Sequence, residues 1–140
     1  MIIEEQVKAL LNVDSMLGAF KDYRGRDQDA PILQLANFDE QQELESDRIF
    51  LIRESGTSGG DSFGQQQIVS IYLFGLPTKS DMPVVKNRAD EILTYLLPHR
   101  EYCNIIGVNV QSFGLPVNFT ETGRPFCEII IETMVDRGIN

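Results

Sequence analysis

The second half of the chain switches between two hydrophobic periods, and this constrains the fold more than any other feature. Gln67–Phe74 is apolar on both faces of an extended strand, whereas Asp81–Leu97 has apolar residues at the spacing of one helix face. Asn104–Phe113 and Phe126–Asp136 return to the period of two that is typical of strands. A strand, a helix and two more strands in this order predict helices packed against a sheet.

The first half adds further elements to this unit. An apolar stripe predicts a helix over Glu4–Leu11, and a second short helix is expected over Met16–Phe20, capped by Asp14 or Ser15. Strands are predicted at Ile32–Ala36 and Arg48–Arg53. Two polar segments are expected to connect these elements: Lys21–Ala30 and Asn37–Asp47.

Together these patterns predict an α+β fold with a mixed, mainly antiparallel sheet of four to five strands and two main helices packed on it. The length of 140 residues is that of one domain, so residues 1–140 are expected to form a single unit.

The segment 54–66 has four glycines and three serines among thirteen residues. Such a composition buries little apolar surface to offset the entropy of ordering, so a flexible hairpin loop is predicted here, at about 54–66. Long loops of this kind are usually functional or ordered by a partner. A phosphate-binding loop is excluded, because the segment has no lysine and leads into a strand.

The charge balance argues against nucleic-acid binding. The chain has 21 acidic and 12 basic residues and a net charge of -9, whereas affinity for nucleic acid comes largely from cations. The densest group of basic residues, Lys21–Arg26, is diluted by Asp22 and Asp27. No apolar run is long enough for a transmembrane helix. The acidic N-terminus does not fit a signal peptide, so the chain is expected to stay in the cytoplasm where it is made.

No pattern of residues predicts catalysis. Two cysteines and one histidine cannot supply a tetrahedral zinc site, and no nucleophile elbow occurs. His99 is expected at a helix end. A final hairpin centred near Asn118 would place Cys127 opposite Val110, far from Cys103, which argues against a disulfide. The expectation is a protein that is not an enzyme, with no catalytic residues, no cofactor and no metal.

The last strand has two different faces. Cys127, Ile129, Ile131, Thr133 and Val135 are predicted to point one way, and Glu128, Ile130, Glu132 and Met134 the other. Two carboxylates among apolar side chains suit a sheet edge or a contact between subunits better than a free surface.

Three stretches carry a family resemblance: residues 3–17 in the first helix and its break, Asn87–Leu93 in the long helix, and Thr120–Ile129 with its Gly-Arg-Pro turn. With the order of elements, they resemble the tail terminator (tail completion) proteins of tailed bacteriophages. The resemblance implies a structural virion protein of the tail, assembled in the host cytoplasm. It implies a homo-oligomeric ring, typically a hexamer, that caps the tail tube, ends its polymerisation and offers a surface for the neck or head-completion protein. DNA would pass through the lumen without specific binding, and no membrane is involved.

Within this interpretation, several residues are candidates for contacts with subunits or partners. The glycine-rich loop would become ordered against a neighbouring subunit or the tube. Arg124 would pair with an acidic residue of the adjacent subunit, or else is a surface arginine beside a turn. The candidates are Arg53, Gly59, Gly60, Asp61, Phe63, Arg124, Glu128 and Glu132.

Two other functions remain open from the sequence. A head–tail connector, neck protein or tail tube subunit could have a similar fold, and a tube subunit would polymerise into filaments. An intracellular small-ligand-binding domain would instead have a closed apolar pocket and no assembly partner.

Overall fold

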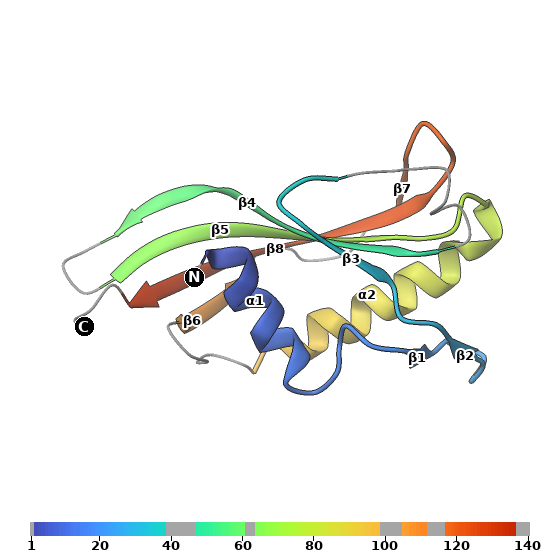
Figure 1. Cartoon of the computed structure of the whole chain (residues 1–140), viewed down its shortest axis with the longest axis horizontal. Coiled ribbons are helices and arrows are strands. Elements are labelled where there is room, and N and C mark those ends of the chain that lie inside the picture. The colour runs from blue at the N-terminus through green and yellow to red at the C-terminus, as the bar shows by residue number, and fades with distance from the viewer. Residues whose placement is uncertain (1, 39–46, 61–63, 99–104, 112–116, 137–140) are drawn as a thin grey trace.

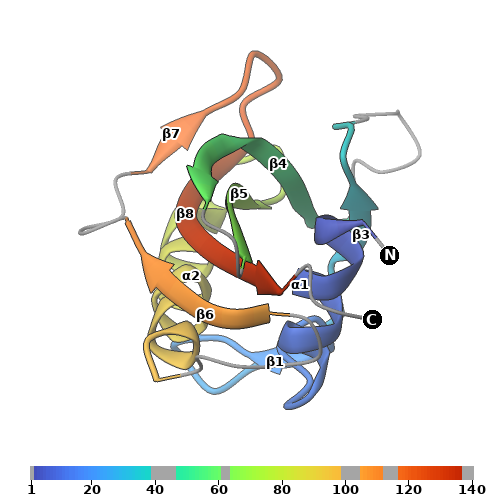
Figure 2. The same ribbon diagram turned by 90° about the vertical axis from the view of Figure 1, so that its left-hand side faces the viewer.

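The computed structural model describes residues 2–38, 47–60, 64–98, 105–111 and 117–136, with backbone alone for 57–60, 64, 65, 106 and 136. Its main feature is a strongly twisted sheet (Figures 1 and 2). The strands follow one another across the sheet in the order β3 (Ile32–Leu35), β4 (Ile49–Gly60), β5 (Gly64–Phe74), β8 (Pro125–Asp136) and β6 (Ile105–Val110).

The long strand β5 lies at the centre of the sheet. It pairs antiparallel with β4 on one side and with β8 over its whole length on the other. β3 runs parallel to β4, and the short strand β7 (Asn118–Phe119) pairs with the first residues of β8. The predicted α+β class, with a mixed and mainly antiparallel sheet, is confirmed.

Both α-helices lie on the same face of the sheet (Figure 1). The first, α1 (Ile3–Asn12), contacts β4 and β5, and α2 (Met82–Leu96) contacts β8, β5 and β6. A 3-10 turn, η2 (Lys79–Asp81), precedes α2. No helix among the described residues is long and apolar enough to cross a membrane.

Alternating side chains of the strands and one stripe of each helix form the main hydrophobic core. The helix-facing positions of β5 are Val69, Ile71 and Leu73. At the spacing expected for one helix face, α2 contributes buried Val85, Ala89, Ile92 and Leu96.

The prediction of a loop over residues 54–66 is wrong for its described part. β4 continues to Gly60 and β5 begins at Gly64, so these residues form the arms of a long hairpin. Backbone pairing within the sheet, where β8 supports β5 from its other side, supplies the stabilisation that the side chains lack. The pairing shifts register between Glu54 and Gly56 and between Thr57 and Gly59. Such bulges bend a strand, and β4 arches over its neighbours in Figure 2.

Two predictions for the first half also need correction. Met16–Phe20 is not a helix, because the chain turns after α1 and Ser15 adopts a left-handed backbone with a φ of 59°. The predicted loop Lys21–Ala30 contains a small two-stranded ribbon, with β1 (Phe20–Lys21) antiparallel to β2 (Asp27–Gln28).

The predicted register of the last hairpin is wrong by four residues. Val110 lies opposite Ile131, not Cys127. The reason is that β7 occupies the edge of β8 near its start, so β6 pairs with the later half of β8. Cys127 is a free, buried thiol, and burial raises its pKa to about 11, so it packs as a small apolar core residue. Cys103 and His99 lie outside the described residues.

Gly75 provides a test of the packing between β5, β8 and α2. A Cβ atom at this position would lie 2.5 Å from Asp81 Oδ2 and from Val85 Cγ2, and 3.0 Å from Pro125 Cγ. We therefore expect Gly75→Ala to lower the free energy of unfolding by about 2 kcal/mol through overpacking, measured by urea denaturation. The matched control is Gly107→Ala, whose new methyl group would meet its nearest neighbour, Met134 Cβ, at 3.7 Å. Equal stability of the two variants would contradict the tight packing at Gly75.

Candidate assembly surface

The sheet face opposite the helices carries its own side chains, and we call it the open face. The same alternation that sends Val69 and Ile71 into the core sends their neighbours on β5 to this side. On β8 the open face receives Glu128, Ile130, Glu132 and Met134, as the sequence predicts, and the strand register places them opposite residues of β5.

One end of the open face is closed by aromatic side chains. Ile49 and Leu51 of β4 are buried there beneath a group of stacked or tilted rings. The ring centroids of Phe38 and Phe74 are 4.3 Å apart, and those of Phe74 and Phe126 are 5.1 Å apart. This end therefore forms a second, small hydrophobic core.

The centre of the open face combines aromatic and charged groups around Tyr72. The Arg53 guanidinium donates a hydrogen bond to the Tyr72 hydroxyl at 2.9 Å and lies 5.3 Å from the centre of its ring. Glu128 lies directly opposite Tyr72 on β8. Burial raises the pKa of Tyr72, and the neighbouring Glu128 carboxylate raises it further. Arg53 itself is exposed, so this cluster can be reached from outside.

The far end of the open face has a shallow hollow of about 210 Å³ across β5, β8 and β6. Its walls combine polar residues with Met134, Gly107 and the buried Val108. The lining residues are Gln66, Gly107, Val108, Asn109, Glu132 and Met134. The hollow is smaller than the usual small-molecule site of about 300–1,000 Å³, and it suits a single side chain of a partner better.

The structure brings together three of the predicted interface residues. Arg53, Glu128 and Glu132 all lie on the open face. Gly59 and Gly60 lie in the last residues of β4, described in backbone only, and Asp61 and Phe63 lie outside the described residues. An interface role for these residues stays a prediction.

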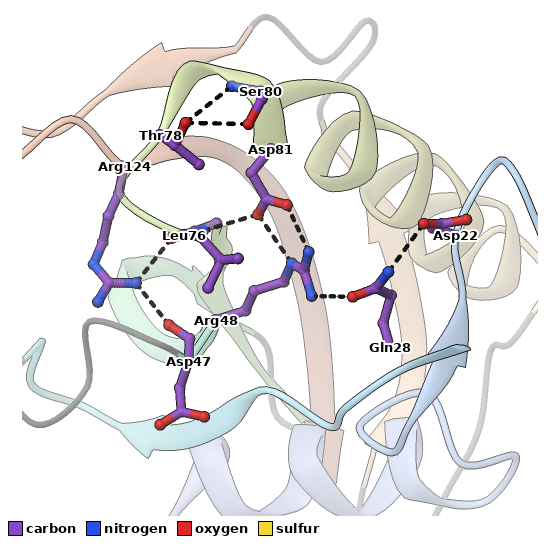
Figure 3. A network of polar contacts seen from close by, with 10 residues as sticks. Asp22, Gln28, Asp47, Arg48, Leu76, Thr78, Ser80, Asp81 and Arg124 are labelled. Carbon is purple, nitrogen blue, oxygen red and sulfur yellow. Dashed lines mark hydrogen bonds and ion pairs between the residues drawn. The ribbon is translucent and has the colours of Figure 1, made fainter. Parts of the chain in front are cut away.

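Arg124 is placed differently from the other candidates. Its side chain is 0% exposed, and its Nη1 donates to the backbone carbonyls of Asp47 at 2.7 Å and of Gly75 at 2.8 Å (Figure 3). The alternative prediction, a surface arginine beside a turn, is therefore wrong. The predicted contact with an adjacent subunit would require the guanidinium to leave these carbonyls.

A second buried arginine lies close by and was not singled out from the sequence. Arg48 Nε donates to Asp81 Oδ2 at 2.9 Å, and Nη2 pairs with Oδ1 at 2.5 Å. Its Nη1 donates to Gln28, whose amide in turn donates to Asp22 (Figure 3). The Arg48–Asp81 pair thus joins the start of β4 to the turn before α2 and to the β1–β2 ribbon. Because Arg48 and Asp81 are 33 residues apart in the sequence, no local sequence pattern could have predicted this pair.

No group of three or more His, Cys, Asp or Glu side chains among the described residues could hold a metal ion.

A family model, the phage tail termination protein, matches residues 13–137. The chain belongs to this family. A search of curated proteins found no match. The terminator is a structural and non-enzymatic phage tail protein, and therefore a component of the virion. Membership implies an interaction with the tail tube and agrees with the family resemblance inferred from the sequence.

The buried ion pair gives a quantitative prediction. Asp81→Ala leaves the buried Arg48 guanidinium without its counter-charge, and we expect a loss of about 3–5 kcal/mol in the free energy of unfolding, measured by urea denaturation. The control is Asp27→Ala, which removes the exposed pair with Lys21 and should change stability by less than about 1 kcal/mol. Similar losses in both variants would show that the Arg48–Asp81 pair has no special role.

Proposed function

We propose that this terminator forms a ring, typically a hexamer, that caps the tail tube, ends its polymerisation and offers a surface to the neck or head-completion protein. The family match supports the tail role, and the open face supports assembly through protein surfaces. Because the ring is closed by one contact repeated around an axis, each subunit uses two different surfaces.

The open face is the observation that carries this proposal. Its centre has an exposed arginine, a half-buried tyrosine and a half-buried carboxylate, and its far end has a hollow of side-chain size. Tyrosine and arginine are among the residue types most enriched at interface hot spots. Arg53, Glu128 and Glu132 are therefore proposed to contact the tube or the adjacent subunit. Gly59, Gly60, Asp61 and Phe63 are proposed to take part in the same contacts.

The charge of the chain fits a channel for DNA. With a net charge of -9, a ring of several copies would repel phosphates, so DNA would pass through its lumen without specific binding. The proposal includes no membrane, cofactor or metal.

Electron microscopy of the purified protein, alone and with tail tubes, tests the function. The expected result is rings, or rings seated on tube ends that no longer grow. Filaments of the pure protein would instead identify a tube subunit. A monomer that binds neither itself nor tubes would overturn the proposal.

Arg53→Glu tests the open face. Reversing an exposed charge at the centre of a contact should weaken capping by about tenfold or more, counted as capped tube ends at a fixed protein concentration. Lys79→Glu makes the same charge change at an exposed site before α2 and should cap normally. Normal capping by Arg53→Glu, with native stability in both variants, would remove Arg53 from the interface.

A further inference from the structure

The β1–β2 ribbon is a preformed turn held by one carboxylate. Asp22 accepts hydrogen bonds from the backbone N–H groups of Arg24 at 2.9 Å and Arg26 at 3.0 Å, and from the Gln28 amide at 3.0 Å. The hydrogen bond from the backbone N–H of Arg26 is the main cause that lowers the pKa of Asp22. Gly25 supplies the left-handed residue of the turn, with a φ of 79°. The ribbon tip is therefore ordered without using the guanidinium groups of its two arginines.

The side chains at this tip form a basic and aromatic knob. Tyr23 is 47% exposed, and the Arg24 guanidinium lies 5.1 Å from the centre of its ring. Arg24 and Arg26 are exposed, and neither forms an ion pair with a described residue of its own chain. The nearby carboxylate of Asp27 is paired with Lys21 at 2.9 Å. In an acidic protein, the knob presents two arginines that are free to meet a partner.

The knob is fixed to the rest of the molecule. Gln28 connects the ribbon to the buried Arg48–Asp81 pair. The centre of the Phe20 ring lies 5.8 Å from the Arg48 guanidinium and 4.8 Å from that of Arg88. Figure 1 shows the ribbon at one end of the helical layer, on the side away from the sheet. Binding through the knob would therefore require little additional ordering of its backbone.

A groove of opposite charge lies along α2, between this helix and the turn that follows α1. It has a volume of about 410 Å³. Met16 and the Tyr95 ring supply apolar surface, and the Tyr95 hydroxyl donates a hydrogen bond to the Leu10 backbone carbonyl at 2.8 Å. Polar side chains line the rest of the groove: Asn87, Asp90, Glu91 and Thr94.

The two carboxylates of this groove differ in their availability. Glu91 pairs with the buried Arg88 at 3.2 Å and accepts from Asn87, yet its side chain remains 44% exposed. Asp90 is exposed and forms no ion pair with a described residue. A groove with carboxylates beside apolar side chains fits arginine, whose stem packs on apolar surface while the guanidinium donates to a carboxylate.

We propose that the Tyr23–Arg26 knob of one subunit docks in the α2 groove of the next. The inference rests on the proposed ring and names one contact that closes it. A second copy is the occupant because the same chain carries both complementary parts. Since knob and groove are different surfaces, the contact is heterologous and can repeat around a ring axis.

Charge reversal tests the contact from both sides. Arg24→Glu with Arg26→Glu, and separately Asp90→Arg, should each raise the apparent dissociation constant of the ring by about tenfold to a hundredfold, because like charges then meet. Analytical ultracentrifugation of the full chain measures ring formation, and electron microscopy counts rings on tube ends. All three positions are exposed, so urea denaturation should show native stability.

The triple variant with all three reversals supplies the decisive measurement. In this variant opposite charges meet again across the contact. The apparent dissociation constant of the ring should therefore return to within about threefold of the wild-type value. The matched controls are Lys8→Glu with Lys79→Glu, and Glu5→Arg, which change the same net charge at exposed sites outside knob and groove. These should form rings as the wild type does.

The other outcomes overturn the inference in distinguishable ways. Normal rings from the Arg24→Glu, Arg26→Glu variant would reject this contact and leave the proposed function standing. Loss of rings without recovery in the triple variant would reject the pairing of knob with groove. Salt-sensitive DNA retention by the wild type that disappears in the knob variant, with rings intact, would assign the knob to DNA. A wild type that forms no rings, alone or on tubes, would reject both proposals.

Discussion

The continuous pairing of β5 with β4 on one side and β8 on the other is the constraint on which the rest of the structure depends. β5 pairs with β8 from Gly64 to Phe74. Because each backbone group of a central strand has a partner, the ladder orders a glycine-rich and serine-rich segment that buries few side chains. The same ladder fixes the register, and the register decides which side chains face the helices.

The two faces of this sheet differ in what they pack against. One face packs against α1 and α2 and supplies the main core. The other is closed at one end by aromatic rings and carries Arg53, Tyr72 and Glu128 at its centre. A sheet that is covered on one side only is a common architecture for antiparallel strands. We propose that this terminator contacts other proteins through the open face.

Two of the buried arginines, Arg48 and Arg124, connect elements that the sheet alone does not join. Arg48 ties the start of β4 to the turn before α2 and to the β1–β2 ribbon, and Arg124 ties the start of β8 to carbonyls of Asp47 and Gly75. The ribbon thereby gains a defined position, although its strands have only two residues each. A surface role for such an arginine cannot be inferred from its residue type alone, because burial turns it into a structural group.

The sequence by itself determined the fold class, both main helices, the alternation of β5 and β8 and the family. These follow from periods of 3.6 and 2 residues, which depend only on neighbours along the chain. Only the tertiary structure decided that residues 54–60 are strand, that Val110 faces Ile131, that Arg124 is buried and that Arg48 meets Asp81. Each of these depends on a partner far away in the sequence, and the free energy of such long-range pairing overrides the local preference of glycine, serine or arginine.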